Sequence, residues 1–119
     1  MLNTDYKIKQ HDKNFLEKNG FWLNHKFSCQ EETIYTKRFP IRKYNDRITF
    51  DGRFMVILET GEVRIDVIDN SDGSLYGPWY YEDNQLHKPL TDQFVKAIEK
   101  EMRKVGITHA RKNKNKVSQ

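Results

Sequence analysis

The sequence predicts an α+β domain: an antiparallel β-meander of about five or six strands, with a short N-terminal helix and a C-terminal amphipathic helix packed on one face. Three observations predict this fold class. Apolar and polar residues alternate through the centre of the chain, as in half-buried strands. Turn-forming dipeptides separate these segments. Near the C-terminus, apolar residues recur at spacings of three and four, which indicates an amphipathic helix.

The first elements are a short helix and a strand. We expect a helix from about Lys13 to Asn19, because Asp12 is a good N-cap residue and Gly20 a good residue to end a helix. Phe21 and Leu23 then alternate with polar residues. This alternation predicts a first strand directly after the helix.

The β signal strengthens at residues 33–36, a run of strand formers that leads to Pro40, a residue confined to sheet edges and bulges. The segment around Tyr44 to Asp46 is a predicted turn. The dipeptide Asp51-Gly52 predicts a hairpin, and a loop that also includes Arg53 keeps the apolar residues of both strands on one face.

A second hairpin is predicted at Thr60-Gly61, between strands 53–59 and 62–69. A tight turn at this dipeptide would place six apolar residues on one face of the sheet. The expected cross-strand pairs are Leu58 with Val63, Val56 with Ile65, and Phe54 with Val67.

The segment after residue 69 predicts a turn, an edge strand and the long helix. A turn at residues 70–73 leads into a strand at 75–81, which contains Pro78 and is therefore expected at a sheet edge or bulge. We expect the helix from Leu90 to Val105, with Thr91 as N-cap and Gly106 as the left-handed residue that ends it. Its apolar stripe comprises Phe94, Val95, Ile98, Met102 and Val105.

Length and charge predict one domain and a tail. A chain of 119 residues suits a single domain, which we expect over residues 1–107. Residues 108–119 are polar, basic and aperiodic, so we expect a disordered tail. The net charge of +4 arises in this tail, which contains Arg111, Lys112, Lys114 and Lys116.

The expected location is the cytoplasm. Cys29 is the only cysteine and cannot form an internal disulfide, and no signal-peptide pattern opens the chain. The longest apolar run, residues 54–58, is far shorter than the roughly 20 residues that a membrane-spanning helix requires, so we expect no membrane contact.

Catalytic and cofactor motifs are weak. His25 and Cys29 would meet as base and nucleophile only on a helix, which this segment does not predict. The histidines are scattered without metal-ligand spacing, and no glycine-rich phosphate loop is present. We therefore expect no cofactor and no metal, and the chain is more typical of a binding protein than of an enzyme.

An aromatic cluster is the most specific candidate site. Trp79 and Tyr81 share a face with Arg64 in the predicted sheet, and aromatic and arginine side chains are typical of binding hot spots. We expect these three residues to form a partner-binding surface. Alternation sends Tyr76 and Tyr80 to the other face, near the core. The competing interpretation places Trp79 in the core as well.

Three classes of function remain. The leading hypothesis is a small binding or adaptor protein that acts through a protein partner, such as an accessory factor of a phage or mobile element. The alternative is a nucleic-acid-binding accessory protein that uses the basic tail and a basic strand region, consisting of Arg38, Arg42, Lys43, Arg47 and Arg53. A small enzyme of unknown class is the third.

Overall fold

The computed structural model describes residues 6–76 and 88–109. Within them, one antiparallel sheet of seven strands has the order β2-β3-β4-β5-β1-β7, and β6 pairs with β5. The expected α+β fold is confirmed. The strands are β1 (Tyr6–Ile8), β2 (Trp22–Leu23), β3 (Ile34–Tyr44), β4 (Arg47–Ile57), β5 (Glu62–Asp69), β6 (Ser74–Tyr76) and β7 (Ile107–His109).

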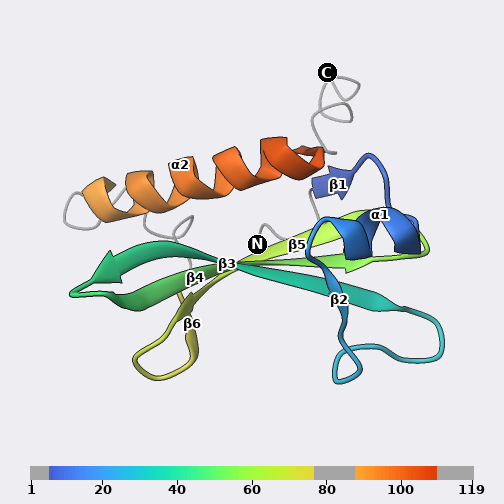
Figure 1. The fold of residues 1–119 in the computed structure, drawn as a ribbon, viewed down its shortest axis with the longest axis horizontal. Coiled ribbons are helices and arrows are strands. Elements are labelled where there is room, and N and C mark those ends of the chain that lie inside the picture. The colour runs from blue at the N-terminus through green and yellow to red at the C-terminus, as the bar shows by residue number, and fades with distance from the viewer. Residues whose placement is uncertain (1–5, 77–87, 110–119) are drawn as a thin grey trace, which may run out of the picture.

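Two helices lie on one side of this sheet, α1 (Lys13–Lys18) and the long α2 (Lys88–Val105), whereas the loops 24–33 and 70–73 lie on the other side (Figure 1). The core fills the space between the helices and the sheet. The helices contribute the buried residues Leu16, Phe94, Ile98, Met102 and Val105, and β4 and β5 contribute Phe54, Val56, Val63, Ile65 and Val67.

The helix ends follow the capping rules. Asp12 accepts a hydrogen bond from the backbone N–H of Phe15 at 3.1 Å, as expected of the N-cap of α1. Gly106 has φ +82 and donates its N–H to the carbonyl of Met102 at 2.9 Å, which ends α2 as expected. The start of α2 differs, because the helix begins at Lys88 and Thr91 therefore lies in its first turn rather than at the N-cap.

The hairpin predicted at Asp51-Gly52 is wrong. Both residues lie inside β4, and the actual β3–β4 turn is at Asn45 and Asp46, where a turn was also expected and where φ is 51° and 66°. Gly52 lies there because it pairs with Phe39, whose ring covers the backbone. The glycine therefore marks a close approach of a side chain rather than a turn.

In the β4–β5 hairpin the expected residues face the core, but they pair across the strands in a different register. Val56 pairs with Val63 and Phe54 with Ile65, two residues away from the expected pairs. The turn covers residues 58–61 and is closed by a 2.8 Å hydrogen bond from the N–H of Gly61 to the carbonyl of Ile57. A shift of two residues keeps every side chain on its face, so five of the six expected core residues are still buried, and Leu58, which now lies in the turn, is partly buried.

The sheet is larger than the sequence predicts, since β1 and β7 were not expected. β1 pairs with β5 on one side and with β7 on the other. Thr108 and His109, which the sequence assigns to the tail, belong to β7. Of the strand expected at residues 75–81, the structure describes Leu75 and Tyr76. The ring of Tyr76 packs edge-on against Phe94 at 5.5 Å, on the core face as expected.

Candidate functional site

A pocket of about 540 Å³ lies on the side of the sheet opposite the core. Phe54 and Val56 point into the core, so alternation turns Arg53, Met55 and Ile57 of β4 to the other side, which we call the pocket face. Cross-strand partners share a face, and the remaining apolar wall residues come from β3, β5, β6 and the loop 24–33. The apolar lining comprises Phe27, Ile34, Met55, Ile57, Val63 and Leu75.

The loop 24–33 forms one wall of the pocket and is organised by Asn24. This side chain is buried, donates from Nδ2 to Thr36 Oγ1 at 3.0 Å, and accepts at Oδ1 from the N–H of Phe27 at 3.3 Å. Ser28 adds a second link, since its hydroxyl donates to the carbonyl of Asn24 and accepts from the N–H of Ile34, both at 2.8 Å. The fixed loop holds Phe27 against the sheet.

The far end of the same loop is fastened to the β4–β5 turn. The carboxylate of Glu59 accepts the backbone N–H of Thr33 at 2.9 Å and its hydroxyl at 2.7 Å. These two hydrogen bonds, the one from the backbone first, hold the pKa of the Glu59 carboxyl below its usual 4.5, because they favour the charged form. Both ends of the loop are therefore anchored.

Charged groups of both signs line the pocket. Arg53 Nη2 is 2.9 Å from Asp66 Oδ2, and Arg64 Nε is 3.6 Å from the other oxygen of the same carboxylate. The guanidinium of Arg53 lies 5.6 Å from the centre of the Phe27 ring, and its Nε is buried without a hydrogen-bond partner in the part of the chain that the structure describes. Arg64 is half exposed, and the lining also includes Glu32 and Glu62.

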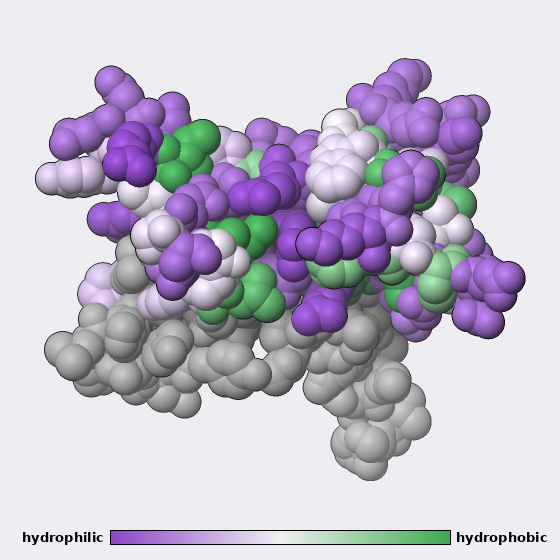
Figure 2. All heavy atoms as spheres, turned by 90° about the horizontal axis from the view of Figure 1, so that it is seen from below, coloured by the Kyte–Doolittle hydropathy of each residue, from purple (hydrophilic) through white to green (hydrophobic). Residues whose placement is uncertain are grey.

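Apolar surface extends beyond the pocket. Phe27 and Leu75 of its lining are 46% and 55% exposed. Trp22 pairs with Thr36, a pocket-face residue, and is 49% exposed. Figure 2 shows this side of the molecule, where apolar side chains lie between charged ones. An apolar patch bordered by polar groups is typical of an interaction surface.

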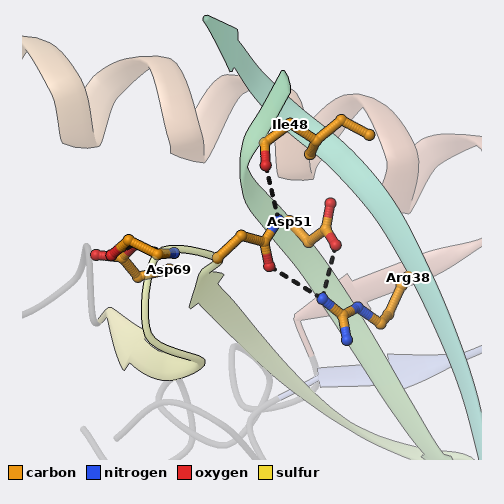
Figure 3. Close-up of polar contacts among 6 residues, drawn as sticks. Arg38, Ile48, Asp51 and Asp69 are labelled. Atoms are coloured by element: carbon orange, nitrogen blue, oxygen red, sulfur yellow. Dashed lines mark hydrogen bonds and ion pairs between the residues drawn. The ribbon is translucent and has the colours of Figure 1, made fainter. Parts of the chain in front are cut away.

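The five cations of the basic strand region, which we considered for nucleic-acid binding, form two groups, one with acidic partners and one without them among the described residues. Arg38 points to Asp51, with Nη2 2.7 Å from the carboxylate, and also donates to Asn70 at 3.2 Å (Figure 3). Arg53 is paired with Asp66 in the pocket. The other three cations, Arg42, Lys43 and Arg47, are exposed and make no ion pair within residues 6–76 and 88–109.

Of the expected partner-binding residues, Arg64 lies in the pocket wall, whereas Trp79 and Tyr81 are outside the described residues. The same holds for the tail cations Arg111, Lys112, Lys114 and Lys116. Sequence reasoning missed the pocket itself and the role of Asn24. The sequence signal for the role of Asn24 is its position, directly after a strand and before a polar loop.

No helix places His25 and Cys29 together. Both side chains are exposed, and the thiol is 3.8 Å from the carboxylate of Glu31. Within the described residues no group of three or more His, Cys, Asp or Glu side chains could hold a metal ion. None of the described helices is long and apolar enough to span a membrane.

Comparisons with protein-family models, curated proteins and solved structures found no significant match to this chain.

Proposed function

We propose that the protein is a non-catalytic binding protein that takes an apolar segment of a protein partner into the pocket on the pocket face. One observation carries the proposal: the pocket-lining residues Phe27 and Leu75 are themselves exposed, and the exposed ring of Trp22 lies outside the lining on the same face of the sheet. A pocket for a small molecule buries most of its ligand, whereas an apolar patch that spreads over the surrounding surface fits a macromolecule.

The charges around the pocket define the partner further. Arg64 is half exposed, and Glu32 and Glu62 lie on the same lining. A partner segment with an apolar anchor residue, flanked by one acidic and one basic residue, would meet a complementary group on each side. We expect the anchor to contact Met55 and Leu75, and an acidic flank to contact Arg64.

We also propose that the protein acts in the cytoplasm. Cys29 is a free and exposed thiol, and such a thiol stays reduced in that compartment. A single exposed thiol in an oxidising compartment would pair with other chains.

A library of random peptides displayed on phage provides the test, with the full chain as bait. We expect enriched peptides with an apolar anchor next to charged residues. Leu75→Asp should lower their affinity at least about tenfold, because it places a charge in the apolar wall. Arg64→Glu should weaken peptides with an acidic flank.

Lys18→Glu is the matched control for Arg64→Glu, since Lys18 is exposed on α1 and the charge change is the same. It should leave peptide affinity unchanged. The proposal is wrong if no peptide is enriched, or if the enriched peptides bind the Leu75→Asp protein as tightly as the unchanged one.

A further inference from the structure

The end of the β3–β4 hairpin, residues 41–48, which we call the hairpin end, is a second candidate surface. It contains Arg42, Lys43 and Arg47, all exposed, and a single acidic residue, Asp46. Every other arginine of the strands has an acidic partner: Arg38 has Asp51, and Arg53 and Arg64 share Asp66. Among residues 6–76 and 88–109, the positive charge of the hairpin end is therefore not neutralised by an ion pair.

The hairpin end is held in one position. Asn45 and Asp46 have left-handed backbone angles, as a tight hairpin turn requires. Arg42 Nη1 donates to Gln93 Oε1 of α2 at 2.8 Å, so one strand is linked to the helix. Asn70 Nδ2 donates to the carbonyl of Ile48 at 3.1 Å, which links the other strand to the β5–β6 turn (Figure 3).

The hairpin end also contains an exposed aromatic residue. Tyr44 is 68% exposed, the largest fraction among the large apolar and aromatic side chains that the structure describes as exposed. It follows Lys43 in the chain and pairs with Arg47 across the turn. An exposed ring beside unpaired cations is the combination that binds single-stranded nucleic acid, because bases stack on the ring and phosphates pair with the cations.

We propose that the hairpin end binds single-stranded nucleic acid. Arg42, Lys43 and Arg47 neutralise phosphates, and a base stacks on Tyr44. None of the pocket residues belongs to the hairpin end, so this surface is independent of the proposed protein-binding pocket. The contacts are to the backbone and to the face of a base, and binding should therefore show little sequence preference.

Fluorescence anisotropy of the full chain with a labelled oligothymidylate of about ten nucleotides tests this proposal. The triple variant Arg42→Ala, Lys43→Ala and Arg47→Ala should lose at least about tenfold in affinity at low salt. With three phosphate contacts removed, the slope of log affinity against log salt should become shallower by about 2.

The matched control is the triple variant Lys7→Ala, Lys13→Ala and Lys18→Ala, which removes the same charge from exposed sites elsewhere and leaves the tail intact. It should retain most of the affinity. Tyr44→Ala should lose about fivefold or more, whereas Tyr44→Phe, which keeps the ring, should bind normally.

Three results would overturn the proposal. The first is no anisotropy change for the unchanged protein at low salt. The second is an equal loss in both triple variants, which would mean that net charge alone determines binding. The third is equal or tighter binding to a duplex of the same length, which would contradict the assignment to single strands.

Discussion

The ring of Phe39 occupies the space that a side chain at Gly52 would need: a Cβ atom there would lie 2.4 Å from two of the ring carbons. The two residues pair across β3 and β4, and the ring also packs against Phe54, with ring centres 4.8 Å apart. Phe39 is 5% exposed and cannot move into solvent without opening the core. The absence of a side chain at residue 52 is therefore a packing requirement.

Gly52→Ala should destabilise the protein by about 2 to 3 kcal/mol, because the added methyl group displaces a buried ring. Urea denaturation measures the change. Phe39→Leu makes room at the same place, so the double variant should lose less stability than the sum of the two single variants. Strictly additive losses would show that the ring does not limit residue 52.

Ile98→Asp should destabilise the protein by about 3 kcal/mol or more. Ile98 is 1% exposed in the stripe of α2 that faces the sheet, and an aspartate there would be a buried charge without a partner. Glu99→Ala, on the exposed side of the same helix turn, should change stability by no more than about 0.5 kcal/mol. An unchanged melting temperature for Ile98→Asp would contradict the position of α2.

Asp66→Ala should cost about 2 to 3 kcal/mol, because it leaves the guanidinium of Arg53, whose side chain is 16% exposed, without its acidic partner. The same substitution in an Arg53→Met background should cost clearly less, since the cation that then loses Asp66 is Arg64, which is half exposed and solvated. Thermal melts of the unchanged protein, the two single variants and the double variant give the coupling free energy between Arg53 and Asp66. Equal costs in both backgrounds would mean that Arg53 does not depend on Asp66.

Acid should release the loop 24–33 from Glu59. The pKa of its carboxyl is below the usual 4.5, so the hydrogen bonds to Thr33 stabilise the fold above pH 4.5 and are lost as the pH falls through the lowered value. The melting-temperature difference between the unchanged protein and Glu59→Gln should therefore shrink in acid. In an NMR titration, Thr33→Val should raise the pKa of Glu59, since the hydroxyl is lost, and an unchanged pKa would contradict this origin.

Elements with local signals could be predicted from the sequence, and elements defined by distant partners could not. The cap Asp12 and the terminator Gly106 lie directly beside the helices they define, and the apolar stripe lies within α2. By contrast, β1 has three residues and is a strand only because β5 and β7 lie beside it. Such a short segment carries no detectable period.

The same reason explains what was missed at the sites. Whether a cation is free depends on its neighbours in space: Arg53 finds Asp66 across the sheet, whereas Arg47 finds no acid among the described residues. The pocket needs Phe27 from a loop and Leu75 from β6, which are far apart in the sequence. The β4–β5 hairpin shows which part of a sheet the sequence does predict. Alternation predicts which side chains share a face, but it does not determine which residues pair across the two strands.

NMR mapping of a bound peptide is the most direct test of the proposed binding pocket. A peptide selected against the full chain is titrated into protein with labelled methyl groups of isoleucine, leucine, methionine and valine. We expect shifts at Ile34, Met55, Ile57 and Leu75, which line the pocket, and small changes at Val67 and Ile98, which lie in the core on the other side of the sheet. Shifts confined to other surfaces, with the pocket methyl groups unchanged, would contradict the proposed pocket.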